Sequence, residues 1–196
     1  MALHDVLLTA TQLAMGFSLA AACGLRAFLP VFLTGLFSRL GYLQLGHGFE
    51  WMGSTPALIT FGSAVVFELL GDKIPVVDHA LDAGGVVVKP LAASLLAASL
   101  FTQIDPALAS VAGLISGGTM AGSVHVLKAK TRLGSTLVTA GMANPFLSLL
   151  EDAMALVATF VALLAPYVAA FVLLVVISTT AIIAYSVLPR RSSPAR

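Results

Sequence analysis

The sequence has very little charge. Only 10% of its 196 residues are Asp, Glu, Lys or Arg, 59% are hydrophobic, and the mean hydropathy is +1.02. A soluble globular domain carries about 25% charged residues, because water must hydrate its surface. Lipid must therefore contact most of the surface of this chain. The net charge of +1 also excludes a nucleic-acid-binding protein that depends on bulk positive charge.

Cysteine and N-terminal basic residues are scarce as well. Cys23 is the single cysteine, which excludes an internal disulfide and a metal site built from cysteines. The first five residues contain no Lys or Arg, whereas a secretory signal begins with basic residues. We expect the first apolar stretch to remain in the protein as a membrane span.

What the sequence does contain is a series of long apolar stretches. A spanning helix needs about 20 mainly apolar residues. Six stretches approach this length, at residues 6–25, 55–71, 86–102, 107–125, 145–165 and 168–188. Segment 28–41 is apolar but shorter, and is either a span or a re-entrant helix. We predict an all-α, polytopic transmembrane helical bundle of six or seven spans, forming one domain over residues 1–188 and followed by a short basic tail at 189–196.

The basic residues predict the orientation of this bundle. With seven crossings and the N-terminus outside, nine of the 10 Lys and Arg residues lie on one side, and only Arg39 lies on the other. If 28–41 re-enters, eight still lie together. Because Lys and Arg gather in cytoplasmic loops, segment 72–89, segment 128–132 and the C-terminus are predicted to be cytoplasmic. A bacterial-type inner membrane is the expected location.

Four acids follow the second clear span, at Glu68, Asp72, Asp78 and Asp82. Glu68 lies inside the apolar stretch, and an intramembrane carboxylate is costly enough to suggest a functional site. Carboxylate oxygens at Asp72, Asp78 and Asp82 could bind a divalent cation, or the group could relay protons. The alternative is an acidic interfacial loop without a binding role.

A second polar group begins the stretch at 145–165. Asn144 and Pro145 start a helix whose free N–H groups favour anions, and Glu151 and Asp152 follow two turns later. Broken helices with polar ends at membrane depth form the sites of many transporters. We include Asn144, Glu151 and Asp152 in the predicted ion-binding site, against the alternative of a capped helix with solvated acids.

Basic residues are predicted to be charge partners or anion ligands of this site. These residues are Arg26, Lys73, His125, Lys128 and Arg132. Arg26 lies between two apolar segments, and either reaches lipid phosphate or pairs with Glu68 or Glu151. The group from His125 to Arg132 follows a span, so it either anchors the chain to the inner surface or binds an anionic head group.

Glycines recur along the stretch at 107–125, at Gly113, Gly117, Gly118 and Gly122. Small residues at this spacing let another helix backbone approach closely. The pattern predicts packing within the bundle or a homo-oligomer contact.

Four motifs, at 24–30, 72–82, 125–132 and 144–152, resemble those of a bacterial integral-membrane family known only as domain-of-unknown-function family 4126. The resemblance covers nearly the whole chain and implies a membrane location without an activity. Segment 68–73 is similar to the Glu-x-Gly-Asp-Lys signature of cation/proton exchangers, but has one additional residue and no second copy. Segment 24–35 is similar to the first motif of undecaprenyl-diphosphate phosphatases, but Ala27 stands where that motif has a catalytic Glu.

The sequence therefore leads to one main hypothesis and two alternatives. The main hypothesis is a secondary transporter or ion-coupled permease, in which Glu68, Asp72 and Asp78 bind a cation or proton. The first alternative is a protein or enzyme that binds a lipid phosphate resembling polyprenyl phosphate, with acids holding a metal. The second is a structural membrane subunit whose charges serve assembly alone.

Overall fold

The computed structural model describes residues 3–139 and 142–187, and this part of the chain is helical with no strand. The helices are α1 (Leu3–Leu25), α2 (Phe28–Arg39), the 3-10 turn η1 (Glu50–Gly53), α3 (Thr55–Gly71), α4 (Pro75–Ser99), α5 (Pro106–Gly113), the π-helical turn η2 (Leu114–Gly118), α6 (Thr119–Thr139), α7 (Asn144–Leu164) and α8 (Pro166–Val187). The predicted all-α class is confirmed. The predicted basic tail at 189–196 lies outside the described residues.

Polar caps and prolines fix where several helices begin. The Ser54 hydroxyl accepts a hydrogen bond from the Ala57 N–H at 3.3 Å before α3, and the Asp105 carboxylate accepts one from the Ala107 N–H at 2.8 Å before α5. Proline occupies the first turn of α3, α4, α5 and α7, where its missing N–H removes no intrahelical bond.

Four helical segments of the described chain are long and apolar enough to cross a membrane: Leu3–Leu25, Ala80–Ser99, Pro106–Thr139 and Asn144–Leu164. Three apolar helices are shorter, so the predicted six or seven crossings are supported in part. At 1.5 Å per residue, the 12 residues of α2 extend about 18 Å, well short of a hydrocarbon core of about 30 Å. By length alone, α2 is therefore too short to cross a core of that thickness.

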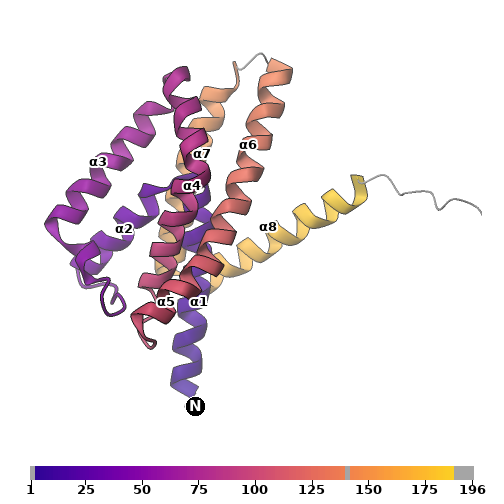
Figure 1. The fold of residues 1–196 in the computed structure, drawn as a ribbon. Helices are drawn as coiled ribbons and strands as arrows, with labels where there is room; N and C mark the ends of the chain where they lie inside the picture. The colour runs from indigo at the N-terminus through magenta and orange to yellow at the C-terminus, as the bar shows by residue number, and fades with distance from the viewer. Residues whose placement is uncertain (1–2, 140–141, 188–196) are drawn as a thin grey trace, which may run out of the picture.

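The helices alternate in direction between two ends of the bundle (Figure 1). One end, called the hairpin end here, carries the α3–α4 and α6–α7 turns. The other, the loop end, carries the start of α1, the chain between α2 and α3, and the α4–α5 turn. Two hydrogen bonds join these loop-end segments, from Gly46 N–H to the Ser99 carbonyl at 2.7 Å and from Gln12 to Thr102 at 2.7 Å. Helix α8 leans away from the other helices in Figure 1.

The glycine-rich segment packs against α4 of the same chain. A Cβ atom at Gly113 would lie 2.7 Å from the Ala98 nitrogen, and one at Gly117 would lie 2.9 Å from the Ala93 carbonyl carbon. Gly118 and Gly122 face α4 as well, at Ser94 and Pro90. The four glycines thus pack within the bundle, which is the first of the two alternatives that their spacing predicted.

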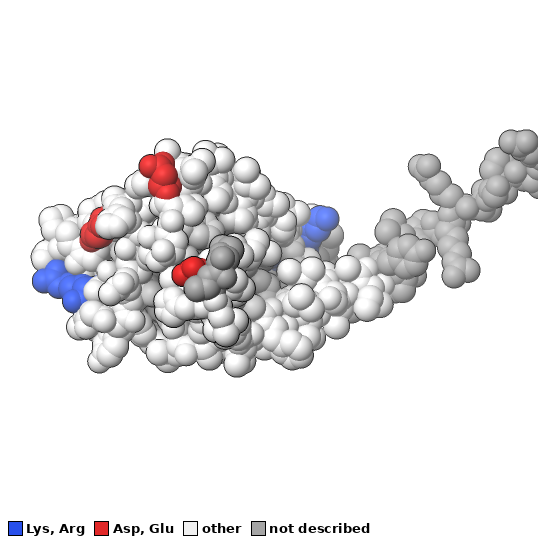
Figure 2. Space-filling model, turned by 90° about the horizontal axis from the view of Figure 1, so that it is seen from below, with Lys and Arg blue, Asp and Glu red and all other residues white. Residues whose placement is uncertain are grey.

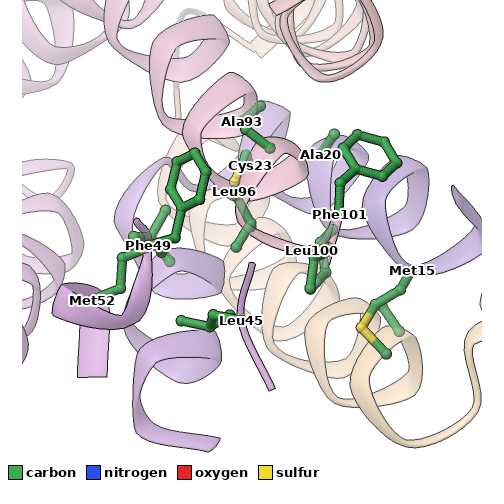
Figure 3. Packing of buried hydrophobic residues seen from close by; sticks show 14 of the residues in the cluster. Met15, Ala20, Cys23, Leu45, Phe49, Met52, Ala93, Leu96, Leu100 and Phe101 are labelled. Atoms are coloured by element: carbon green, nitrogen blue, oxygen red, sulfur yellow. The ribbon is translucent and has the colours of Figure 1, made fainter. Parts of the chain in front are cut away.

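A core of apolar side chains, from alanine to phenylalanine, lies between α1, α4 and the chain that follows α2 (Figure 3). Leu19 and Cys23 of α1 and Leu96 of α4 are completely buried, as is Met52 of η1. The α2–α3 connection is therefore folded into the bundle, and this holds α2 and α3 in place beside the site described below.

The outer surface is that of a membrane protein. Large apolar side chains are exposed along α3, α6, α7 and α8, where water would destabilise them and lipid would not. Seen from the loop end, the surface carries only isolated charged side chains (Figure 2). Tyr42, Tyr167 and Trp51, the single tryptophan, are exposed near this end. Such aromatic side chains are typical of the membrane–water interface.

Candidate functional site: a buried charge network

Helix α6 turns three of its four basic residues into the bundle. His125, Lys128 and Arg132 share one helix face and are 4–6% exposed, whereas Lys130 is exposed. The expectation that this segment closes a span and anchors it at the surface is wrong for the three buried residues. The helix continues to Thr139, so these side chains lie alongside α4 and α7 and not beyond them.

Arg132 joins carboxylates from three parts of the chain. Its guanidinium lies 2.8 Å from Glu151 of α7 and 3.3 Å from Asp72, which follows α3. It also pairs with Asp78 and, at 3.4 Å, with Asp82, both on α4. One cation thus contacts four of the carboxylates that the sequence assigned to the site.

Lys128 lies one turn before Arg132 and extends the same set of contacts. Its ammonium group is 3.0 Å from Glu151 and 3.8 Å from Asp82. It also donates to the backbone carbonyl of Leu25, the last residue of α1, at 3.4 Å. Lys128 therefore connects α6 to the point where α1 ends.

Arg26 occupies the link between α1 and α2 and is only 1% exposed. It forms ion pairs with Asp72 and Asp152, and donates to the Ser148 hydroxyl at 3.1 Å. The predicted pairing of Arg26 with Glu68 or Glu151 is wrong, because Asp72 and Asp152 are the acids that face the link. The alternative in which Arg26 reaches lipid phosphate is excluded by its burial.

Lys73 completes this side of the site from the α3–α4 turn. Its ammonium group donates to the Ser148 hydroxyl at 2.8 Å and lies 3.3 Å from Asp152. Ser148 accepts from both Lys73 and Arg26, so the site depends on a hydroxyl that the predicted site did not include. Its position one turn before Asp152, on the same face of α7, was the available signal.

Glu68 has a different kind of partner from the other acids. Its carboxylate accepts hydrogen bonds from the backbone N–H groups of Ala27 at 2.9 Å and Phe28 at 3.2 Å. These groups form the start of α2, where no side chain of the link itself provides a cap. Glu68, from α3, therefore caps α2 across the bundle.

Lys89 is a site residue that the sequence analysis missed. Its side chain, on α4, is 3% exposed, and its ammonium group lies 3.2 Å from Nδ1 of His125. The signal was present, since Lys89 is a cation inside a predicted span, and intramembrane charges usually mark a functional site.

A cavity of about 190 Å³ lies among these residues. Its charged lining consists of Arg26, Glu68, Asp72, Asp82, Lys89 and Lys128. The cavity adjoins the α1–α2 link and the start of α2, since Ala27 and Phe28 also line it.

Taken together, six carboxylates and five cations form what we call the charge network. Its members are Glu68, Asp72, Asp78, Asp82, Glu151, Asp152, Arg26, Lys73, Lys89, Lys128 and Arg132. The whole chain has nine acids, so two thirds of them meet in this one place. Such concentration is not what a set of independent surface charges produces.

The charge network is not arranged as a metal site. The described residues contain no group of three or more His, Cys, Asp or Glu side chains that could hold a metal ion. Asp72, Asp78 and Asp82, which the sequence analysis offered as ligands of a divalent cation, instead converge on Arg132. A guanidinium group takes the place that the hypothesis gave to the metal.

Asn144 lies apart from the charge network. Its amide nitrogen donates to the Thr136 hydroxyl at 3.0 Å, which connects the start of α7 to the end of α6. In the described part of the chain this amide forms no hydrogen bond to a member of the network, and its role in ion binding stays a prediction.

The electrostatics of Asp72 show how strongly the cations act. Burial alone would raise the pKa of its carboxyl group. Arg26 foremost, with Lys128 and Arg132, outweighs burial and lowers the pKa below its ordinary value of 3.8. Asp72 therefore remains charged, as its two arginine partners require.

Shared contacts are the property that distinguishes this site from a set of separate ion pairs. Asp72 is held by two arginines, Asp152 by Arg26 and Lys73, and Glu151 by Lys128 and Arg132. When each charge has two partners, one contact can open without leaving a buried charge unpaired. The acids and cations of α3, α4, α6 and α7 can therefore change ion-pair partners without leaving a charge unpaired.

Comparison with known proteins supports the family resemblance and adds no activity. No curated protein and no solved structure matches the chain, so the local similarities to cation/proton exchangers and undecaprenyl-diphosphate phosphatases are not confirmed. One family model, described as a domain of unknown function (DUF4126), matches residues 13–186. This match covers most of the chain and every residue of the charge network. The protein therefore belongs to the DUF4126 family.

Proposed function

We propose that this protein is a small ion-coupled secondary transporter whose site is the buried charge network. The observation that carries the proposal is the position of the network. Three carboxylates and three cations of the network line a cavity at the point where α1 breaks into α2, and the other members are linked to them by ion pairs. Transporters commonly build their sites where an interrupted helix lines a polar cavity.

Energetics favour this function over a structural role. Replacing a buried ion pair by apolar residues of similar volume is often neutral or stabilising by about 1–4 kcal/mol. A subunit that needed only stability gains nothing from a network of this size. Arg132, with four carboxylates in contact, instead keeps other partners when one contact opens, and alternating conformations need contacts that can be exchanged in this way.

Burial disfavours the lipid-phosphate alternative. A lipid head group needs basic side chains that it can reach, but Arg26, Lys128 and Arg132 are at most 6% exposed and are paired with carboxylates. Binding a phosphate there would first require those ion pairs to break. We therefore expect small ions, and not lipid head groups, to reach the network.

A flux measurement in liposomes tests the transporter proposal. The purified protein is reconstituted into vesicles containing a pH-sensitive dye, and an acid step is applied outside in the presence of single ions from a cation series and an anion series. We expect one series to accelerate the internal pH change above that of protein-free vesicles. Absence of acceleration by every ion in both series contradicts the proposal.

Two variants of α6 provide the matched control. Lys128→Gln removes a buried cation of the network, whereas Lys130→Gln makes the same change at an exposed position two residues further on. We expect the first to abolish the flux and the second to preserve it. Equal loss in both variants, with both proteins folded, contradicts the assignment of the network as the transport site.

A further inference from the structure

The carboxylate of Glu68 occupies a position suited to a free anion. The start of a helix presents unpaired N–H groups and the positive end of the helix dipole. Here the N–H groups of Ala27 and Phe28 point to Glu68, and the 190 Å³ cavity lies beside them. In this structure, the negative group at the start of α2 is the carboxylate of Glu68.

Two buried cations beside the start of α2 have unused capacity for an anion. Nε of Arg26 has no hydrogen-bond partner, although the side chain is 99% buried and lines the cavity. Lys89 lines the same cavity. Its ammonium group is hydrogen-bonded to His125 and has no carboxylate within 4.0 Å in the described structure. These donors are independent of the helix start and favour the same kind of ligand.

Charge balance identifies the group that must change when an anion enters. The cavity lining holds three cations and three carboxylates. Asp72 and Asp82 are paired with arginine or lysine, so neutralising either leaves a buried cation with fewer partners. Glu68 is held by backbone N–H groups alone, so a proton on Glu68 breaks no ion pair.

We propose that the cavity binds a small monovalent anion in place of the Glu68 carboxylate, with uptake of one proton by Glu68. The step adds one negative and one positive charge, so the net charge of the buried site is unchanged. This inference rests on the proposed transport function and names its substrate class. Because a water molecule occupies about 30 Å³, the cavity has room for a halide, nitrate or short carboxylate.

Groups from every neighbouring element determine the pH dependence of this exchange. The titratable and charged side chains around Glu68 are Cys23 of α1, Arg26 of the link, Asp72 after α3, Asp82 and Lys89 of α4, and Lys128 of α6. The three cations attract the incoming anion, and the two aspartates repel it. Removal of the Glu68 charge therefore shifts the balance towards binding.

Direct binding to the purified protein in detergent tests the inference, with radiolabelled chloride and radiolabelled formate as separate probes. We expect wild-type affinity for at least one probe to be about tenfold higher at mildly acidic than at mildly alkaline pH, corresponding to one charge-assisted contact. Glu68→Gln should bind more tightly than the wild type at mildly alkaline pH and should show a weaker pH dependence. Lys89→Met should bind about tenfold more weakly, and Lys130→Met should match the wild type.

Several results overturn the inference. These are wild-type binding that does not depend on pH, a folded Glu68→Gln protein that binds neither probe, and absence of binding of both probes at both pH values. If Glu68→Gln does not fold, the wild-type pH dependence and the Lys89→Met comparison decide the question. Flux driven by cations without anion binding refutes this inference and leaves the transporter proposal intact, whereas anion binding without flux refutes transport alone.

Discussion

A single methyl group at Gly117 tests how closely α4 and the glycine-rich helix pack. The Cβ of an alanine there would lie 2.9 Å from the Ala93 carbonyl carbon and 3.0 Å from the Ala97 Cβ, and closer still to the Ala93 carbonyl oxygen. The nearest atoms belong to the backbone of α4, so no side-chain rotation relieves the overlap. One helix must move as a whole.

The expected effect of Gly117→Ala is a loss of about 1–3 kcal/mol in the free energy of unfolding, the usual range for overpacking. Gly134→Ala is the matched control. It lies further along the same continuous helix, and a Cβ there meets nothing within 4 Å. Because alanine is the better helix former, this control should gain about 0.5–1 kcal/mol. The two identical substitutions should therefore change stability in opposite directions.

The single cysteine provides the assay. Cys23 is completely buried between α1 and its neighbours, so a thiol-reactive fluorescent dye labels it only as the bundle unfolds. Melting curves recorded with this dye should place Gly117→Ala below the wild type and Gly134→Ala at or above it. A Gly117→Ala protein that melts at or above the wild-type temperature refutes the close approach of the two helices.

Three further predictions concern the charge network and the orientation of the bundle. Arg132→Gln should lower the free energy of unfolding by about 3–5 kcal/mol, because it leaves buried carboxylates unpaired, whereas Lys130→Gln should leave the melting curve nearly unchanged; equal effects contradict the buried assignment. Since Asp72 has a lowered pKa in the folded state, its contribution to stability is present above its ordinary value of 3.8 and is lost as the pH falls through the lower folded pKa. The acid-induced fall in melting temperature should therefore be shallower in Asp72→Asn, and identical pH profiles refute this linkage. An impermeant thiol reagent outside intact cells should label Tyr42→Cys at the loop end and not Met142→Cys at the hairpin end, and the reverse pattern contradicts the predicted orientation.

The length and composition of the apolar stretches predicted the positions of the helices better than they predicted the residues at which the helices end. The segment at 55–71 coincides with α3, because Ser54 and Pro56 mark its start and Gly71 its last residue. The predicted segment at 107–125 stops 14 residues before the helix does, since α6 ends at Thr139. The error has a physical cause. The rule that a span ends at its first basic residues assumes that those residues seek water, but in α6 they face acids from other helices.

All members of the charge network except Lys89 could be predicted, but their pairing could not. Eleven residues besides Asn144 were proposed from the cost of charges near apolar stretches, and all of them occupy or contact the network. Pairing depends on the rotation of each helix about its axis, which one sequence does not specify. Arg26 illustrates this, because both candidate partners were acids of the right helices, yet the residues four positions after Glu68 and one after Glu151 face it.

The break between α1 and α2 depends on one such contact between helices, the one that the proposed mechanism uses. At the break the N–H group of Ala27 is buried and that of Phe28 is partly buried, and a buried unsatisfied donor costs about 1–3 kcal/mol. Glu68 supplies the acceptor, and the same two donors stabilise its buried charge. Each feature thus requires the other, so Glu68→Gln should lower stability, since one amide oxygen replaces two carboxylate oxygens. It follows that Glu68 can leave the start of α2 only when another acceptor replaces it. A water molecule or an incoming anion can meet that requirement, and the proposed exchange is the case in which an anion does so.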